Sequence, residues 1–424
     1  MNYLEKNKES FIEDLKGLIK IKSYLTNPEN YPTPELISAL DYMINLAKRE
    51  GFKYFKDEDN HYCYIEIGEG KELIGILGHL DVVPPGQDLS RWENDPFELK
   101  VDGDLLKGRG TQDDKGPVMQ QFYLLKKLAE SKKKLTKRIR LILPTDEESF
   151  WRGVDKYKSD GQEIPTYGYT ADAFFPVVYS ERELWEFRLK GKPSTKFTLK
   201  AGEALNVVPD EVEYVNSKGE IHKEFGKAAH AMEPQEGENA IVKIIPSISE
   251  KNQLIDFIKN EVKNETNGQT LFNKLFVDDN NLEMSVNLAV VNINEEKGEI
   301  LFDLRIPNST NSKELKEILL EKIKNNYSDL EFEEYDWLTG VYIKKDSFIM
   351  KNLIESYQSV TKDLISEPTA TGGATYARSM PNIVAFGPYF KDTPQTEHQY
   401  NEYSRLSDFI KSFDIYEEFF KKIL

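Results

Sequence analysis

The sequence changes its pattern twice, and this interruption restricts the fold more than any other feature. Residues 61–67, 73–78 and 138–143 are short apolar runs of the strand type, with a helical pattern between the last two. The order strand, helix, strand is typical of an α/β layer with parallel pairing, in which helices cover both faces of the sheet. Near residue 184 the pattern changes to alternating antiparallel strands, and the α/β pattern returns after residue 342.

These two changes predict one discontinuous domain that is interrupted by another. We expect residues 1–185 and 341–424 to form one α/β domain, with a mixed, mainly parallel sheet flanked by helices. Residues 186–340 are expected to form an inserted α+β domain. Its expected elements include helices at 238–247 and 251–263, a hairpin that turns around Gly298, and a helix at 312–326.

The formal net charge of −17 excludes two classes of partner. Nucleic acids and anionic membrane surfaces would both be repelled by a chain of this charge. No apolar stretch approaches the roughly 20 residues needed to span a bilayer, and the first residues, MNYLEKNKESF, are too charged for a signal peptide. The single cysteine, Cys63, forbids an internal disulfide and fits a reducing compartment. We therefore expect a cytoplasmic protein without nucleic-acid or membrane partners.

The stretch GILGHLDVVPPGQ ends an apolar strand with two polar residues, His79 and Asp81. Side chains two residues apart in a strand point the same way, and ligands of open α/β sheets bind beyond the carboxyl ends of the strands. Asp81 would then hold the imidazole of His79 in the tautomer that a metal requires. Taken alone, a His and an Asp at a strand end are more often surface or capping residues.

Further acidic and imidazole groups follow the other predicted strands. They are Asp113 and Asp114 in GRGTQDDKGP, Asp146, Glu147 and Glu148 in LPTDEESF, Asp172 in TADAFFP, and His398 in TPQTEHQYNEY. Each motif alone has an ordinary interpretation as a helix cap or a solvated loop. Together they provide the nitrogen and oxygen ligands expected for zinc or a similar divalent ion. A bridging carboxylate would hold two ions roughly 3.5–4 Å apart.

Taken in order, the motifs resemble the metallopeptidase family that includes acetylornithine deacetylase, succinyl-diaminopimelate desuccinylase, aminoacylase and carnosinase. The nearest resemblance is to its peptidase-V-like dipeptidase branch. It covers nearly the whole chain through GHLDVVPPG, GRGTQDDKGP, PTDEES, TADAFFPVVYSE, NVVPD, AAHAMEP, GGATYAR and HQYNEY. The resemblance implies a zinc-peptidase-like α/β catalytic domain and a ferredoxin-like α+β lid.

The resemblance also implies roles for the acidic and imidazole groups. The implied metal ligands are His79 and Asp172 for one ion, Glu148 and His398 for a second, and Asp113 as the bridge between them. Asp81 is implied to orient His79, and Glu147 to act as general base. The implied cofactors are two divalent ions, with Zn²⁺ expected and Mn²⁺ or Co²⁺ as alternatives. The family commonly has a cis peptide bond after the bridging residue, here between Asp113 and Asp114.

The lid is implied to contribute the remaining site residues. His230, in GKAAHAMEP, matches an oxyanion-stabilising histidine, and the implied substrate contacts are Asn206, Arg305, Gly372 and Gly373. The chain departs from the family pattern at Ala231 and Met232, where a small residue is usual after the histidine, and at Ala374, where Gly is common. Because the lid is longer than a minimal dimerising one, we expect a monomer, with a homodimer as the alternative.

The function implied by the resemblance is that of a metal-dependent dipeptidase, which hydrolyses the peptide bond of short peptides with water activated by two metal ions. An N-acyl-amino-acid deacylase of the same family remains an alternative, because motifs for the metals cannot separate two enzymes that both cleave an amide. A non-catalytic peptide-binding protein is the second alternative. It would require lost ligands, whereas every ligand position and Glu147 are present.

Overall fold

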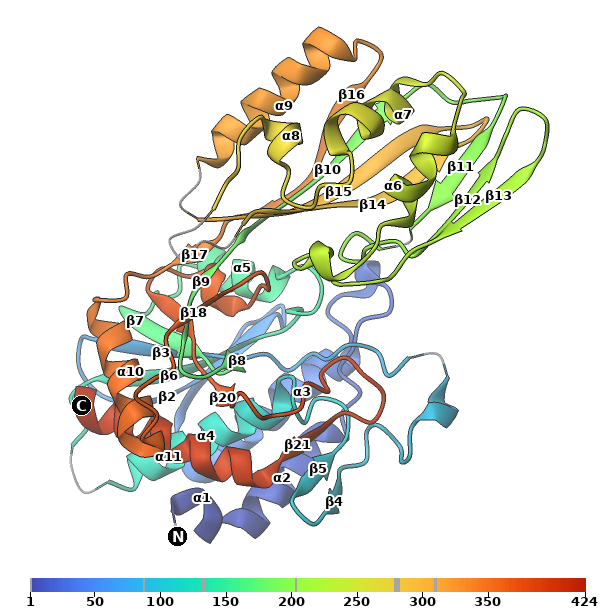
Figure 1. The fold of residues 1–424 in the computed structure, drawn as a ribbon. Helices are drawn as coiled ribbons and strands as arrows, with labels where there is room; N and C mark the ends of the chain where they lie inside the picture. The colour runs from blue at the N-terminus through green and yellow to red at the C-terminus, as the bar shows by residue number, and fades with distance from the viewer. Residues whose placement is uncertain (1, 87, 132–133, 203, 278–282, 309–310) are drawn as a thin grey trace. The chain divides into compact units, whose positions relative to one another are not determined.

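The structure is a computed structural model that describes residues 2–86, 88–131, 134–202, 204–277, 283–308 and 311–424 (Figure 1). The chain divides into two compact units. The main unit comprises Met1–Ser180, Ile343–Ala370 and Ala374–Leu424, and the inserted unit comprises Glu181–Tyr342 and Thr371–Gly373. The main unit is therefore built from segments that lie far apart in the sequence.

A mixed sheet forms the centre of the main unit. Its strands are β1 (Lys53–Lys56), β2 (Tyr62–Gly68), β3 (Leu73–Leu77), β6 (Arg138–Pro144), β7 (Tyr167–Thr170), β9 (Val178–Glu181) and β19 (Ile383–Ala385). They lie in the order β1-β2-β6-β3-β7-β19-β9, and the short strands β17 (Val341–Tyr342) and β18 (Thr369–Thr371) also pair with β9. The central strands β6, β3, β7 and β19 are parallel, whereas β1, β2 and β9 pair antiparallel with their neighbours. All residues of β3 are buried, as expected for a parallel strand covered on both faces.

Helices cover this sheet. They are α1 (Tyr3–Lys6), α2 (Lys8–Ile19), α3 (Pro34–Glu50), α4 (Lys115–Ala129), α5 (Arg152–Ser159), α10 (Phe348–Thr361) and α11 (Leu406–Ile423). Cys63 and Ile65 of β2 belong to one buried core with residues of α3 and α4. Tyr62 and Tyr64, which alternate with them along β2, contact Tyr157 of α5 instead. Successive side chains of a strand point to opposite faces, so α5 lies on the face opposite to α3 and α4.

Short elements complete the main unit. A small sheet contains β4 (Lys100–Asp102), β5 (Leu105–Lys107) and β21 (Tyr403–Arg405), and β8 (Ala173–Phe174) pairs in parallel with β20 (Pro388–Tyr389). The 3₁₀ turns are Pro28–Asn30, Leu89–Arg91 and Tyr376–Ser379, and the strands β17 (Val341–Tyr342) and β18 (Thr369–Thr371) lie where the chain changes unit.

The inserted unit is an antiparallel sheet with helices. Its strands are β10 (Glu183–Gly191), β11 (Thr198–Ala201), β12 (Glu211–Val215), β13 (Ile221–Phe225), β14 (Ser285–Ile293), β15 (Gly298–Ile306) and β16 (Glu331–Leu338), in the order β13-β12-β11-β14-β15-β10-β16. Its helices are α6 (Ala240–Ile244), α7 (Gln253–Phe257), α8 (Gln269–Phe272) and α9 (Ser312–Asn326), with shorter 3₁₀ or π segments at Pro234–Glu236, Ile245–Ser247 and Ile258–Val262. One apolar core joins the sheet to the helices.

Three of the helix and turn predictions for this unit can be compared directly. The helix at 312–326 is confirmed. The helix predicted at 251–263 is shorter, because it starts at Gln253 and continues as a π-helix from Ile258. The predicted hairpin is confirmed, and its turn lies immediately before Gly298. The turn lies at 294–297, where Oδ1 of Asn294 accepts hydrogen bonds from two backbone N–H groups at 2.8 Å and 3.0 Å, and Gly298 begins β15.

Within the described residues, no helix combines the length and the apolar character needed to cross a membrane.

Candidate metal centre

The predicted metal ligands follow the carboxyl ends of neighbouring parallel strands. His79 follows β3, Glu148 follows β6 and Asp172 follows β7. Near their ends, β3 pairs in parallel with both β6 and β7, so the three strands end at one edge of the sheet. This edge is where open α/β sheets bind their ligands.

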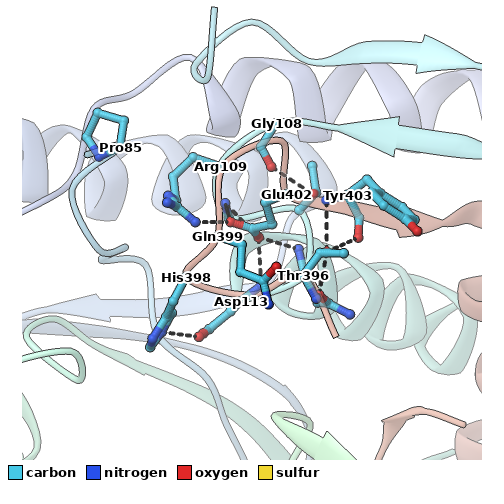
Figure 2. A network of polar contacts seen from close by, with 12 residues as sticks. Pro85, Gly108, Arg109, Asp113, Thr396, His398, Gln399, Glu402 and Tyr403 are labelled. Atoms are coloured by element: carbon cyan, nitrogen blue, oxygen red, sulfur yellow. Dashed lines mark hydrogen bonds and ion pairs between the residues drawn. The ribbon is translucent and has the colours of Figure 1, made fainter. Parts of the chain in front are cut away.

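Asp113 comes from the loop before α4, and its two carboxylate oxygens face two different histidines. Oδ1 lies 2.9 Å from Nε2 of His79, and Oδ2 lies 2.9 Å from Nε2 of His398 (Figure 2). The carboxylate of Glu148 lies 3.1 Å from the same nitrogen of His398, and that of Asp172 lies 3.9 Å from Nε2 of His79. The structure therefore brings all five predicted ligands together, with Asp113 between the two histidines.

The protonation of this cluster is far from that of exposed groups. Burial raises the pKa of Glu148 to about 7 and that of Asp172 to about 8, and the neighbouring carboxylate of Asp113 adds to both shifts. Burial lowers the pKa of His398, but its hydrogen bonds with Asp113 and Glu148 outweigh that effect and raise the pKa to about 11. Crowded carboxylates resist ionisation unless a positive charge is present. Divalent cations would supply that charge.

Two atoms at the centre of the cluster lack a hydrogen-bond partner. Within the described residues, Nε2 of His79 and Oδ1 of Asp113 are buried and make no well-oriented hydrogen bond, although they lie close together. Nδ1 of His79 is engaged with the backbone carbonyl of Asp81 at 3.0 Å, which directs Nε2 toward Asp113. Buried polar atoms normally have a hydrogen-bond partner. This arrangement therefore fits a site at which both atoms would bind a metal ion.

Asp81 contacts His79 mainly through its backbone. The carboxylate Oδ1 of Asp81 lies 3.6 Å from Nδ1 of His79, farther away than its backbone carbonyl. The other carboxylate oxygen, Oδ2, accepts a hydrogen bond of 3.0 Å from the backbone N–H of Glu148. Asp81 therefore connects the loop after β3 to the loop after β6, in addition to orienting the imidazole.

Asp114 has a contact in the site that the sequence did not reveal. The peptide bond between Asp113 and Asp114 is cis, as predicted. Asp114 precedes α4, but its side chain does not cap the helix. Instead, Oδ2 accepts a hydrogen bond of 3.1 Å from the backbone N–H of His79. Its position beside Asp113 was the one signal in the sequence, and that signal also fits an ordinary helix cap.

Glu147 lies on the loop between β6 and α5, beside two aromatic residues. The indole N–H of Trp151 donates a hydrogen bond of 2.7 Å to the backbone carbonyl of Glu147. The ring of Tyr376 lies edge-on to both Trp151 and His79, with centroid distances of 5.3 Å and 6.2 Å. Burial raises the pKa of Glu147 well above its ordinary value. Tyr376 was missed at the sequence level, because a tyrosine in GGATYAR has no distinguishing signal.

In the inserted unit, His230 and Asn206 lie on adjacent segments. The backbone N–H of Ala231 donates to the carbonyl of Asn206 at 2.9 Å, and Val207 and His230 form an isolated β-bridge. Nδ1 of His230 accepts a hydrogen bond of 3.1 Å from the backbone N–H of Met232. Partial desolvation and the positive charge of Arg305 lower the pKa of His230. Because Nδ1 accepts the hydrogen bond from Met232, the ring proton of the imidazole lies on Nε2, which is then a hydrogen-bond donor.

Arg305 is already engaged within the inserted unit. Its Nε and Nη2 bind the two carboxylate oxygens of Asp303 at 2.8 Å and 2.9 Å, and Nη1 donates to the carbonyl of Gly372 at 2.9 Å. A Cβ on Gly372 would lie 2.6 Å from the Cβ of Met232, so the two residues are in close contact. The backbone N–H of Gly373 donates to Oγ1 of Thr371 at 3.1 Å. The structure thus groups Arg305, Gly372 and the segment after His230.

One other cluster of metal-ligand types, Asp57, Asp59 and His61, occurs in the described part of the chain. Nζ of Lys156 lies 3.7 Å from the carboxylate of Asp57 and 3.3 Å from that of Asp59. Asp57 also accepts hydrogen bonds from His61. A lysine therefore already contacts both of these aspartates, in contrast to the cluster around Asp113.

Residues 75–422 match the family described as peptidase family M20/M25/M40. The chain belongs to this family. It is therefore a hydrolase of the peptidase class, as predicted. It is 32% identical to a Staphylococcus epidermidis protein named "Putative dipeptidase", over 96% of this chain and 95% of that protein. It is also 32% identical to "Putative dipeptidase YtjP" of Bacillus subtilis, over 97% of this chain and 96% of that protein.

The fold is similar to that of solved peptidases. The structure of the di-peptidase Dug1p from Saccharomyces cerevisiae superposes with a TM-score of 0.62 at 14% identity, covering 98% of this chain and 96% of that one. An M20 family metallo-carboxypeptidase from Sulfolobus solfataricus gives a TM-score of 0.62 at 16% identity, covering 98% and 99%. The predicted fold class is confirmed: a mixed, mainly parallel sheet with helices, and a separate inserted domain with an antiparallel sheet.

Proposed function

We propose that this M20 peptidase is a metal-dependent dipeptidase, which hydrolyses the peptide bond of short peptides. The observation that carries the proposal is the position of Asp113, whose two carboxylate oxygens each lie 2.9 Å from the imidazole of a different histidine. A carboxylate between two nitrogen ligands is the arrangement needed to bridge two divalent ions. The names of the two bacterial relatives support dipeptides as the substrate class.

The residues of the cluster fit a pair of metal ions. His79 and Asp172 would hold one ion, Glu148 and His398 the other, and Asp113 would bridge them. Imidazole nitrogens and carboxylate oxygens are common ligands of Zn²⁺, and also suit Mn²⁺ and Co²⁺. The unpartnered Nε2 of His79 and Oδ1 of Asp113 support this assignment. We propose Zn²⁺ as the native ion.

When bound, the two ions would supply Lewis-acid activation of water and of the scissile carbonyl. Glu147 is the proposed general base, which accepts a proton from the attacking water and delivers it to the leaving amine. Burial raises the pKa of Glu147, and this is the direction that a base at neutral pH requires. The contact of Trp151 with the backbone carbonyl of Glu147 would keep that residue in place.

From the inserted unit, we propose that His230 donates a hydrogen bond from Nε2 to the developing oxyanion. Its Nδ1 is an acceptor for the backbone of Met232, so Nε2 is available as the donor. Asn206, Arg305, Gly372 and Gly373 are the proposed substrate contacts. Because Arg305 already binds Asp303 and Gly372, its first effect would be to hold the Gly372 loop, and any bond to a substrate carboxylate would use its remaining N–H groups.

The experiment that tests this function is a substrate panel on protein that has been stripped of metal and then reloaded with Zn²⁺, Mn²⁺ or Co²⁺ in turn. We expect no hydrolysis by the stripped protein and restored cleavage of free dipeptides after metal is added. Cleavage of N-acetyl or N-succinyl amino acids alone would identify an N-acyl-amino-acid deacylase instead. Bound metal without any amide hydrolysis would identify a non-catalytic peptide-binding protein.

We further propose that the protein acts as a monomer in the cytoplasm. The single cysteine, Cys63, is buried in the core and unpaired, which suits a reducing compartment. Sedimentation of the purified protein would test the first proposal, because a homodimer would sediment at twice the mass of 49.0 kDa.

A further inference from the structure

Glu402 makes an unusual set of contacts close to the candidate metal centre. Its side chain is fully buried. One carboxylate oxygen accepts hydrogen bonds from the backbone N–H groups of Gln112 at 2.8 Å and Asp113 at 3.2 Å, and the N–H of Gly110 lies 3.0 Å from both oxygens. The other oxygen accepts a bond of 2.6 Å from Nη1 of Arg109 (Figure 2). One carboxylate thus organises the whole loop that presents Asp113.

Gln112 makes the reciprocal contacts. Its side-chain Nε2 donates to the carbonyl of Pro394 at 2.9 Å. Its Oε1 accepts hydrogen bonds from Thr396, from the backbone N–H at 2.7 Å and from the hydroxyl at 2.6 Å. Gln112 is 1% exposed. The loop at 108–114 and the loop at 391–402 therefore each contribute one buried side chain that binds the backbone of the other loop. We call this pair of side chains, Glu402 and Gln112, the loop latch.

The two loops depend on such contacts for their shape. Neither the segment from Gly108 to Asp114 nor that from Lys391 to Glu402 contains a helix or strand. His398 has a φ of 60° and Asn401 a φ of 62°, in the left-handed region that side chains other than glycine rarely adopt. Backbone in this region persists only where its surroundings hold it. The imidazole of His398 is also 52% exposed, against 1% for His79, so packing alone does not fix it.

We propose that Glu402 and Gln112 are positioning residues, which hold Asp113 and His398 at ligand distance and thereby set the affinity of the metal site on the His398 side. Gln112 immediately precedes Asp113, and His398 lies between Thr396 and Glu402. The latch thus flanks both ligands in the sequence as well as in space. This inference rests on the two-ion site proposed above, and neither latch residue is assigned a contact with the substrate.

The chemistry explains why a carboxylate suits this position. An ionised carboxylate is an acceptor only, with room for several donors, and it is surrounded here by one guanidinium and three backbone N–H groups. The substitution Glu402→Gln keeps the shape of the side chain. It replaces one acceptor oxygen by an NH₂ group that faces other donors. The variant therefore tests the hydrogen bonds of the latch and not the volume of the side chain.

The experiment measures binding of Zn²⁺ alone to metal-stripped protein, by competition with a chromophoric chelator, together with the melting temperature. We expect the wild-type protein to bind two ions. In Glu402→Gln the weaker binding step should lose affinity by about 10–100-fold, the usual effect of removing a group that orients a ligand. Gln112→Ala should shift the same step in the same direction. Saturating Zn²⁺ should restore most of the turnover of both variants.

The control is Glu66→Gln. Glu66 is another buried carboxylate of the main unit, and it binds the guanidinium of Arg140 at 2.6 Å and 2.8 Å but contacts no candidate ligand. We expect this variant to lose thermal stability while both binding steps stay unchanged. An equal loss of metal affinity in Glu66→Gln would overturn the inference, because the effect would then be general destabilisation.

The remaining outcomes also decide the question. Wild-type affinity for both ions in Glu402→Gln overturns the inference while the proposed function stands. If Glu402→Gln does not fold, Gln112→Ala decides alone, and an unchanged weaker step overturns the inference. A wild-type protein that binds fewer than two ions would instead remove the two-ion site on which the inference rests, and this result is visible before any variant is made.

Discussion

The two units hold their candidate functional residues in different ways. In the main unit, the ligands come from loops that lie far apart in the chain, and side chains such as Glu402 reach across 292 residues to fix the backbone of the partner loop. In the inserted unit, Asn206 and His230 are joined by backbone contacts between two adjacent segments. The contacts of the metal centre thus run between side chains and distant loops, whereas the His230 and Asn206 segments meet through their backbones.

The units also differ in how their charges are balanced. In the main unit, burial and the neighbouring carboxylate of Asp113 raise the pKa values of Glu148 and Asp172. In the inserted unit, Arg305 is already matched by Asp303. This difference predicts that substitutions of metal ligands or their supports will change ion binding, while substitutions in the inserted unit will change turnover or stability and leave ion binding intact.

The largest expected effect is that of Glu147→Gln, which should break catalysis without breaking the metal centre. Loss of a general base lowers kcat by about 10²–10⁴-fold. Because Glu147 is not a proposed ligand, the variant should still bind two ions. The measurement is steady-state hydrolysis of a dipeptide together with metal content, and Glu58→Gln, an exposed carboxylate of the same unit, is the control. Undiminished turnover would remove Glu147 from its proposed role.

His230→Ala should have the next largest effect. Removal of one oxyanion donor costs about 10²–10³-fold in kcat, and metal content should stay at the wild-type value because His230 belongs to the inserted unit. The matched control is His222→Ala, which removes an exposed imidazole from β13 of the same unit. If His230→Ala lost a metal ion, the proposed separation of tasks between the two units would be wrong.

Asp303→Asn should affect stability. The substitution leaves Arg305 as a buried cation without its opposite charge, and the free energy of unfolding should fall by about 2–3 kcal/mol. Urea denaturation followed by circular dichroism measures this change. The control is Glu299→Gln on the same strand, whose partner Arg188 keeps a second contact with Glu333, so its effect should be below about 1 kcal/mol. Equal losses in the two variants would show that the burial of the Arg305 pair is unimportant.

Much of the metal centre could be predicted from the sequence, because its ligands stand directly after strand-like runs within recognisable motifs. His79 and Asp172 are examples, since each lies two residues beyond a strand. Glu402 could not be recognised in this way. Its contacts join two irregular loops, and irregular loops have no periodicity from which a partner could be inferred.

Two other features show what a closer interpretation of the sequence could have reached. Asp303 and Arg305 lie two residues apart on one strand, so their side chains point the same way. Their pairing could have been predicted from this spacing. The contact between the backbone carbonyl of Asp81 and His79 could not, because the sequence reveals side-chain types and says nothing of which backbone group lies nearest.

The stability of the main unit should also depend on pH, and this dependence should be seen when the protein holds no metal. Burial raises the pKa of Glu148 from 4.5 to about 7 and that of Asp172 from 3.8 to about 8. The folded protein therefore keeps protons that the unfolded chain has already released. The stability contributed by these groups is complete below the unfolded pKa values and is lost as the pH rises through the folded ones. The free energy of unfolding should therefore fall between about pH 5 and pH 8.

Divalent cations should reduce this fall, because they bind the ionised carboxylates of the site and so favour its deprotonated folded state. Urea unfolding at several pH values, with and without Zn²⁺, measures the difference. Asp172→Asn provides the control, since a side chain that cannot titrate should flatten the metal-free profile. A metal-free protein that gains stability as the pH rises over this range would mean that its carboxylates ionise without a cation. The contrast between a cation-dependent main unit and a self-neutralised inserted unit would then be lost.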